Sequence, residues 1–305
     1  MSAAWSSPIY RQTALIVLCF IFLSAAVVYF FRKKNYYFVF SWASIKSWLF
    51  VAPLLFIVLG LPDPWPSISL TLIAIFGAKV FFQLMGMFHR TYFVAITYLG
   101  IIALGYTAAH HRVDLYNLLP MIVIALSCLV PLLRNSYKSM IQYISLTNLA
   151  FVFLGWSFMH LTLIMKFDKG VYQLMYLLIL TEFCDNTNLA ISRYVGKWKM
   201  FDGIDAKRTF ESTLLSALLT VAVAFGMRHL LPDNSEKYWL TAGLIASIGG
   251  FIGDMVMTVI RRDAGIKVVG AFILGRGDFL HRMDRLIFVA PLYYYAMTYL
   301  PEMHL

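Results

Sequence analysis

Residues 253–284 read GDMVMTVIRRDAGIKVVGAFILGRGDFLHRMD. Long apolar runs precede and follow this stretch, whereas the stretch itself is rich in ionisable side chains. Ionisable residues that interrupt apolar runs are typical of functional sites in membrane proteins. We therefore expect the chemistry of the protein to lie here and the surrounding apolar runs to set the fold. The ionisable residues are Asp254, Arg261, Arg262, Asp263, Lys267, Arg276, Asp278, His281, Arg282 and Asp284.

The composition of the whole chain is that of a membrane protein. Of its 305 residues, 61% are hydrophobic and 16% are aromatic, and the mean hydropathy is +0.75. A soluble domain has only about 45–50% apolar residues. The net charge of +10 is explained by basic residues gathered on one face of a membrane, without nucleic-acid binding. Cys19, Cys128 and Cys184 lie far apart and predict neither a disulfide framework nor a metal site.

The apolar runs predict an all-α, polytopic membrane protein with about ten transmembrane helices, since roughly 20 residues are needed for each span. The first run is too long for the core of a signal peptide, so we expect it to be retained. The runs are Thr13–Phe31, Ser47–Leu61, Ser67–Phe88, Thr91–Ala109, Leu115–Leu133, Ile141–Met165, Gly170–Cys184, Glu211–Met227, Tyr238–Ile260 and Arg285–Leu300.

Basic residues predict how these spans are oriented. When the connections alternate between the two sides of the membrane, most Lys and Arg residues fall on one side, which should be cytoplasmic. Both termini are then predicted on the outer side, and the polar segment faces the cytoplasm, in a bacterial inner membrane or an endoplasmic reticulum. The outer side receives only Arg11, Arg112, Lys166, Lys169, Arg228 and Lys237.

A second polar block lies earlier in the chain. Residues 181–212 read TEFCDNTNLAISRYVGKWKMFDGIDAKRTFES. The alternation of connections places this block on the same, cytoplasmic side as the first stretch. We therefore expect an N-terminal transmembrane region over residues 1–170 and a region that carries the polar site over residues 171–305.

The two blocks resemble the signature sequences of the CTP:phosphatidate cytidylyltransferases, also called CDP-diacylglycerol synthases. Both match without a gap and in the order of the family. In the later block, Thr258 and Arg261 stand in for the family's Ser and Lys, and in the earlier block Arg208 replaces a Lys. The matching residues are Gly253, Asp254, Arg262, Gly265, Lys267, Gly275, Gly277, Arg282 and Asp284 in the later block, and Asp185, Gly196, Lys197, Lys199, Thr209 and Glu211 in the earlier one.

The resemblance implies an enzyme that transfers CMP from CTP to phosphatidate or a related lipid phosphate, giving a CDP-lipid and pyrophosphate. Such chemistry needs cations to neutralise the triphosphate. By resemblance, Asp254, Asp284 and Arg261 are catalytic, and Asp254, His281 and Asp284 hold Mg²⁺. The implied partners are CTP, the lipid phosphate, membrane lipid and a second copy in a homodimer, with no nucleic acid. The implied nucleotide- and phosphate-binding residues are Asp185, Lys197, Lys199, Arg208, Thr209, Glu211, Arg262, Lys267, Arg276 and Arg282.

The chain departs from the family pattern at charged positions. Val268 and His281 stand where the family has Asp, Arg276 stands at a His, and Asp278 stands at a Gly. Arg285 stands where many members of the family have Ser. Together these changes make the site more positive than the family pattern by about three charges. Arginine binds phosphate in a bidentate manner, so we expect guanidinium groups to take over part of the role of the metal ions.

Other interpretations stay open. The altered site fits a degenerate paralogue that binds lipid phosphate or nucleotide as a regulatory or partner subunit. It also fits an enzyme in which His281 holds a transition metal beside Asp254 and Asp284. A transporter with a polar core is disfavoured, because the sequence has no internal repeat. Each basic residue, taken singly, also fits an anchor at the membrane interface.

Overall fold

The computed structural model of the chain describes residues 4–31, 36–265, 273–274, 277–278 and 283–300. The predictions on Lys267, Val268, Arg276, His281 and Arg282 lie outside these residues. The described part is mostly helical, and many of its helices are strongly apolar. The prediction of an all-α membrane protein is thereby confirmed.

Helices occupy every predicted apolar run. Two of the long helices contain a π-helical segment: α6 (Met140–Ala150) continues through η2 (Phe151–Ser157) into α7 (Phe158–Ile164), and α10 (Glu236–Leu244) continues through η4 (Ile245–Gly249) into α11 (Gly250–Asp263). The other helices are α1 (Pro8–Phe31), α2 (Tyr36–Leu59), α3 (Trp65–Leu84), α4 (Thr91–Ala109), α5 (Val113–Leu133), α8 (Gly170–Tyr194), α9 (Phe210–Gly226) and α13 (Leu286–Tyr299), with short turns η1 (Ala4–Ser6) and η3 (Arg228–Leu230).

Among the residues that the structure describes, two small antiparallel hairpins interrupt the helices. One pairs β1 (Lys199–Phe201) with β2 (Asp205–Thr209), and the other pairs β3 (Ile273–Leu274) with β4 (Gly277–Asp278). Both lie in the polar blocks, where the sequence analysis expects only connections. The first hairpin matters for function because β2 leads directly into α9 and carries Arg208.

The expected count of about ten transmembrane helices is not confirmed. By length and composition, six helices in the described part can cross a membrane: Pro8–Phe30, Trp65–Leu84, Thr91–Ala109, Val113–Leu133, Met140–Ile164 and Glu236–Asp263. Three shorter apolar helices, Trp48–Leu59, Phe210–Gly226 and Leu286–Tyr299, join them.

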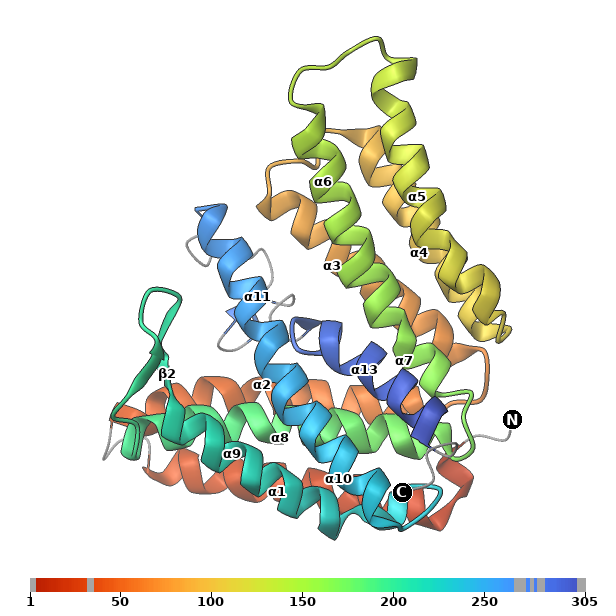
Figure 1. Cartoon of the computed structure of the whole chain (residues 1–305). Helices are drawn as coiled ribbons and strands as arrows, with labels where there is room; N and C mark the ends of the chain where they lie inside the picture. The colour runs from red at the N-terminus through yellow and green to blue at the C-terminus, as the bar shows by residue number, and fades with distance from the viewer. Residues whose placement is uncertain (1–3, 32–35, 266–272, 275–276, 279–282, 301–305) are drawn as a thin grey trace.

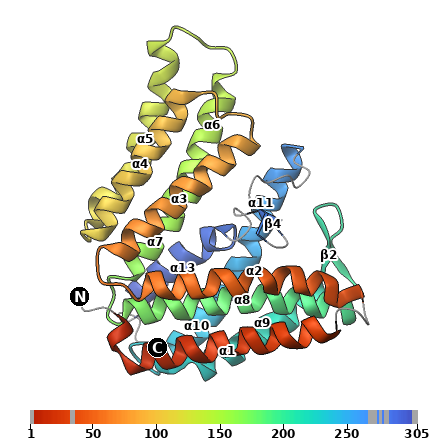
Figure 2. The same cartoon turned by 180° about the vertical axis from the view of Figure 1, so that it is seen from behind.

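The helices form two groups that meet at an angle (Figure 1). Helices α3 to α7 form one limb, and α1, α2, α8 and α9 run together in the other; seen from behind, α1, α2 and α8 lie side by side (Figure 2). Helix α13 packs on α7 of the first limb and on α11 and η4 beside the second limb. It therefore ties the two limbs together, with the polar site at its N-terminal end.

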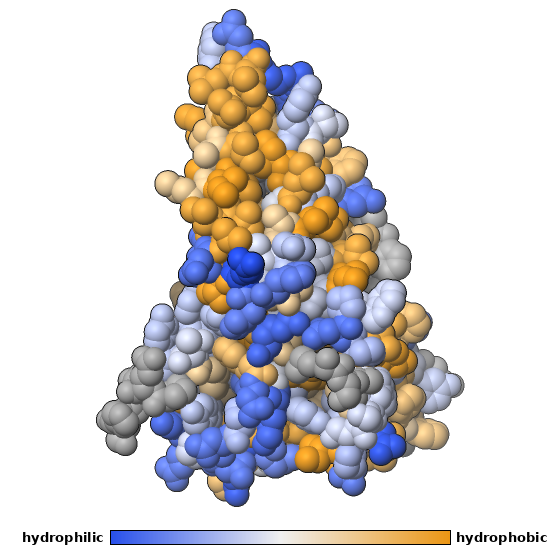
Figure 3. Space-filling model, turned by 90° about the vertical axis from the view of Figure 1, so that its right-hand side faces the viewer, coloured by the Kyte–Doolittle hydropathy of each residue, from blue (hydrophilic) through white to orange (hydrophobic). Residues whose placement is uncertain are grey.

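Apolar side chains cover much of the limb built from α3 to α7, and hydrophilic residues gather at its tip and below it (Figure 3). Along α5 this apolar surface is contributed by large exposed side chains, among them Leu118, Met121, Leu126, Leu129 and Leu132. A soluble protein rarely exposes so many apolar residues together, whereas a helix facing lipid does so along its length. The surface therefore agrees with the membrane assignment.

Candidate functional site: a buried cluster of arginines and carboxylates

A small pocket lies where α8, β2, η4, α11 and the beginning of α13 meet. Asp185 and Asn188 on α8, Arg208 on β2 and Arg285 before α13 line it. Hydroxyl groups complete the wall, including that of Ser247 from the π-helical segment η4. π-helical segments are frequent at functional sites. The pocket thus lies within the earlier polar block, beside Phe251 and Arg285, which flank the later one.

Arg208 stands at the centre of this cluster, with only 4% of its surface exposed. Its Nη2 donates to Asp185 Oδ1 at 3.1 Å and also to Asp254 Oδ2, and its Nε lies 3.6 Å from Asp205 Oδ2. Carboxylates from α8, β2 and α11 therefore surround one guanidinium group. Burying these charges is tolerated because they are paired and hydrogen-bonded.

Two more arginines contact the other acidic groups. Arg285 pairs with the second oxygen of Asp185, and its Nη1 lies 3.9 Å from Glu182 Oε2. Arg261 donates to Asp284, whose surface is completely buried. Each of the buried acids Asp185, Asp254 and Asp284 therefore contacts a guanidinium group.

A close contact between backbones brings the two ends of the later block together. A Cβ atom added at Gly253 would lie 2.4 Å from the carbonyl oxygen of Asp284 and 3.1 Å from Cα of Arg285. Real Cβ atoms essentially never approach other atoms at the first of these distances. Only glycine therefore lets α11 lie directly against residues 284–285, with Asp254 next in the chain. This contact explains why a glycine precedes the aspartate in the sequence pattern.

The junction of β2 and α9 fixes where Arg208 points. Thr209 is the N-cap of α9: its Oγ1 accepts from the Ser212 backbone N–H at 3.3 Å, and Ser212 Oγ accepts from the Thr209 N–H at 3.3 Å. This reciprocal capping satisfies backbone donors at the start of the helix. Because Arg208 immediately precedes the cap, its backbone is held in place beside α8.

The other predicted phosphate-binding residues of the earlier block lie away from the pocket. Lys197 and Lys199 are exposed on the hairpin, and Lys199 pairs with Asp202 at 2.9 Å. The Glu211 carboxylate accepts from the backbone N–H groups of Lys197 at 3.3 Å and Trp198 at 3.1 Å. Glu211 thus holds the base of the hairpin, and the phosphate-binding role of these residues stays a prediction.

Arg262, at the end of α11, also reaches the hairpin. Its Nη1 donates to the backbone carbonyl of Gly203 at 2.9 Å. This contact ties the tip of the hairpin to the helix that carries Asp254. In the described arrangement, Arg262 therefore supports the hairpin from outside the pocket.

Of the residues that line the pocket, the sequence predicts only Asp185 and Arg208 as site residues, and two of the others have polar contacts within the cluster. Arg285 entered only the charge comparison, yet it pairs with Asp185. Asn188 was not considered, although its Nδ2 donates to Thr213 Oγ1 at 3.2 Å and Ser216 Oγ at 3.3 Å. The sequence could have indicated Asn188 as a site residue. It follows Asp185 by three positions, and residues at this spacing lie on the same face of a helix.

Carboxylate oxygens are ligands that Mg²⁺ prefers. Within the residues that the structure describes, however, no group of three or more His, Cys, Asp or Glu side chains is arranged to hold a metal ion. Asp185 and Asp254 converge on the guanidinium of Arg208, and Asp284 on that of Arg261. The described side chains therefore do not fit a metal centre in this arrangement, and His281 lies outside them.

Comparison with known proteins identifies the class. Residues 42–300 match the family model described as "Cytidylyltransferase family", so the chain belongs to this family. The resemblance seen in the two polar blocks is thereby confirmed.

Several relatives are similar over parts of the chain. The uncharacterized protein YnbB of Escherichia coli (strain K12) is 34% identical over 131 residues, which are 43% of this chain and 44% of YnbB. The phosphatidate cytidylyltransferase of Staphylococcus aureus (strain COL) is 28% identical over 182 residues, which are 59% of this chain and 68% of that protein. That of Staphylococcus haemolyticus (strain JCSC1435) is 28% identical over 183 residues, with the same coverage. The match thus spans less than half of YnbB and about two thirds of the two named enzymes.

Proposed function

We propose that the chain transfers CMP from CTP to phosphatidate or a related lipid phosphate, giving a CDP-lipid and pyrophosphate. Membership in the cytidylyltransferase family and the names of the staphylococcal relatives support this proposal. The observation that carries it is the buried guanidinium of Arg208, which contacts Asp185 from one polar block and Asp254 from the other. Side chains that lie far apart in the sequence thus form one cluster of arginines and carboxylates beside apolar helices.

In the proposed reaction, an oxygen of the lipid phosphate attacks the α-phosphorus of CTP. The bond from that phosphorus to the oxygen bridging to the β-phosphate breaks, and pyrophosphate leaves. Negative charge must be neutralised on both the attacking and the leaving group. Arg208, Arg261 and Arg285 suit this role, because guanidinium groups bind phosphate oxygens in a bidentate manner. We propose that their carboxylate partners orient them until substrate arrives.

We also propose Mg²⁺ as a cofactor on the family resemblance, with Asp254, His281 and Asp284 as its ligands. In the described arrangement, Arg208 and Arg261 would have to leave their carboxylates before an ion could bind there.

A second candidate function is binding without transfer, as a regulatory or partner subunit. The arginine contacts on Asp185, Asp254 and Asp284 favour it. The replacement of family aspartates by Val268 and His281 favours it as well. In that case the cluster would hold lipid phosphate or nucleotide without a reacting metal.

We further propose the orientation of the chain in its membrane: about ten spans, the site open to the cytoplasm and both termini outside, in a bacterial inner membrane or an endoplasmic reticulum. In Figure 1 the α3–α4, α5–α6 and α8–α9 connections lie at the left and top, whereas the α2–α3, α4–α5 and α7–α8 connections lie towards the right. This alternation supports the proposal. Residues 171–305 would hold the substrates, and a homodimer is proposed on resemblance alone.

The test is CDP-lipid formation from CTP and phosphatidate by the purified chain in lipid nanodiscs, with Mg²⁺, with Mn²⁺ and with EDTA, beside a His281→Asp variant. We expect metal-dependent turnover by the parent chain and CTP binding that persists in EDTA, because guanidinium groups carry part of the phosphate contact. Turnover only in His281→Asp would favour the binding function. Absence of CTP and lipid-phosphate binding in both proteins would contradict both functions.

A further inference from the structure

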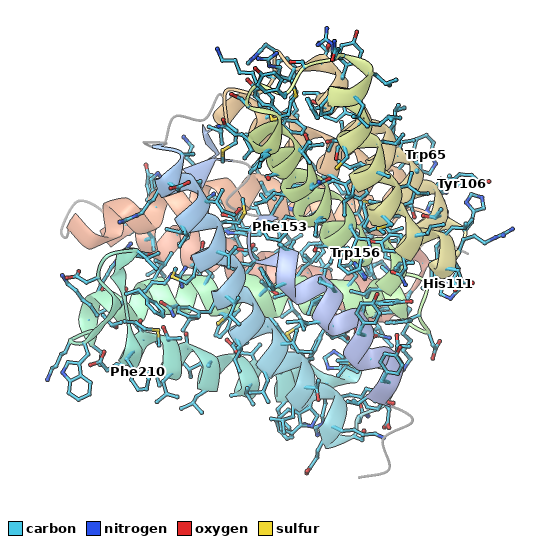
Figure 4. All side chains as sticks on the ribbon, turned by 45° about the horizontal axis from the view of Figure 1, so that its top comes forward. Trp65, Tyr106, His111, Phe153, Trp156 and Phe210 are labelled. Atoms are coloured by element: carbon cyan, nitrogen blue, oxygen red, sulfur yellow. The ribbon has the colours of Figure 1, made fainter. Side chains whose placement is uncertain are left out.

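The outer face of the β1–β2 hairpin carries exposed aromatic side chains. Trp198 is 73% exposed, Tyr194 is 66% exposed and Phe210 is 50% exposed. The Phe210 N–H donates to the Trp198 carbonyl at 2.9 Å, so these two residues lie side by side at the base of the hairpin. Figure 4 shows Phe210 at the edge of the molecule, away from the half-buried Phe153 and Trp156. We call Tyr194, Trp198 and Phe210, with Lys197 and Lys199, the hairpin face.

The hairpin face continues an apolar stripe along α9. Phe210, Leu214 and Leu218 follow one another at a spacing of four residues and are 50%, 53% and 59% exposed. Residues at this spacing share one side of a helix. An exposed apolar stripe on a helix of a membrane protein faces lipid, so Phe210 marks the end of the lipid-facing side of α9. Trp198, its neighbour across the hairpin, lies at the same boundary.

The charges on the hairpin face indicate the kind of surface that it contacts. Lys197 and Lys199 directly flank Trp198, and both are exposed. Lys199 pairs with Asp202, but both side chains are more than half exposed, and such surface pairs exchange readily because they contribute little. Tryptophan and tyrosine are enriched where a membrane meets water, and lysines there attract anionic headgroups. This combination is complementary to the headgroup layer of an anionic bilayer.

We propose that the hairpin face lies in the headgroup layer of the membrane and binds anionic lipid phosphates, with Trp198 and Phe210 as anchors and Lys197 and Lys199 as phosphate contacts. The same hairpin carries Arg208 into the buried cluster. Binding to the lipid surface therefore fixes the position of Arg208 relative to the membrane surface. It also concentrates lipid phosphate beside the pocket. Glu211, which accepts from the N–H of Trp198 at 3.1 Å, is a positioning residue for the anchor. The inference does not require the chain to be a working enzyme.

The test locates Trp198 relative to the membrane. All seven tryptophans are labelled with 5-fluorotryptophan in the full chain, which is placed in nanodiscs that contain phosphatidylglycerol. The fluorine resonance of Trp198 is identified by its loss in Trp198→Phe. Paramagnetic broadening is then compared for a gadolinium chelate attached to lipid headgroups and for a gadolinium chelate free in water. The half-buried Trp156 serves as the interior control.

We expect the headgroup-bound chelate to broaden the Trp198 resonance strongly and the soluble chelate to broaden it much less. If the soluble chelate broadens Trp198 as strongly, the hairpin stands in water and the inference is wrong. If neither chelate broadens it, a second copy or another protein covers the face, which also overturns the inference.

A matched pair of variants tests the charges. In Lys197→Gln/Lys199→Gln, the broadening of Trp198 by a gadolinium chelate on anionic headgroups should fall, because each lysine near an anionic membrane surface strengthens binding to that surface roughly fivefold. Lys237→Gln, at the start of α10 and away from the hairpin, should leave it unchanged. Equal broadening in the parent and the double variant would show that the lysines do not select anionic lipid.

Discussion

Replacing Arg208 by alanine is expected to destabilise the protein by about 3–5 kcal/mol, the usual effect of removing one partner from a buried ion pair. Arg208 is 4% exposed and contacts Asp185 and Asp254, which are 9% and 2% exposed. Without the guanidinium group, both carboxylates lose a buried partner. The free energy of unfolding in detergent is the measurement, together with CDP-lipid formation, which should fall to background.

Two further variants separate charge from geometry in this prediction. Arg208→Lys restores the positive charge and the side chain that the family has at this position, but a lysine cannot bridge two carboxylates as a planar guanidinium does. We expect it to recover part of the stability. Arg112→Ala removes an exposed arginine before α5 and should change stability by no more than about 0.5 kcal/mol. If Arg208→Ala were as stable as Arg112→Ala, the cluster would not be the buried, paired site described above.

The Gly253→Ala variant should lose both stability and activity. The added Cβ would lie 2.4 Å from the Asp284 carbonyl oxygen, which is backbone and cannot swing away. Helix α11 and residues 284–285 would have to separate, and overpacking of this kind costs about 1–3 kcal/mol. The separation would also pull Asp254 from Asp284, so activity should fall further than the loss of stability alone explains.

Gly250→Ala is the matched control for this prediction on the same helix. Its added Cβ would meet its nearest atoms, in Arg285, Thr181 and Val289, at 3.7 Å, which is ordinary van der Waals contact. Since alanine favours a helix over glycine by up to about 1 kcal/mol, this variant should be as stable as the parent or more so. Thermal unfolding of both variants in detergent is the measurement. Equal midpoints for Gly253→Ala and the parent would contradict the close contact.

Much of the helical fold could be predicted from hydropathy, but the ends of the helices could not. The sequence analysis ends one span at Cys184, where polar residues begin, yet α8 continues to Tyr194. The helix continues because Asp185 meets Arg208 and Arg285, so that polar side chains are stabilised inside the bundle. Periodicity and polarity alone do not reveal such tertiary contacts. Helix α2 also begins earlier than the predicted span, at Tyr36 rather than at Ser47.

The candidate site was predicted in part. The two polar blocks indicated that Asp185, Arg208 and Asp254 belong to one site, and these residues are in contact. Sequence spacing could not reveal which arginine pairs with which carboxylate, because that depends on how α8, α11 and the start of α13 pack. For this reason Arg285 was missed as a partner of Asp185. The β1–β2 hairpin was missed because its strands, of three and five residues, are too short to show a clear alternating pattern.

The most direct test of the account is the conversion of labelled CTP to CDP-lipid by Asp254→Asn, compared with the parent and with Asp63→Asn. Asp254 orients Arg208 in the buried cluster, whereas Asp63 pairs with Lys166 at 3.0 Å in a partly exposed connection. Loss of a positioning group should slow transfer on the order of a hundredfold or more. The account predicts that the parent and Asp63→Asn form CDP-lipid at similar rates. It predicts that Asp254→Asn forms CDP-lipid about a hundredfold more slowly. Full activity of folded Asp254→Asn would contradict it.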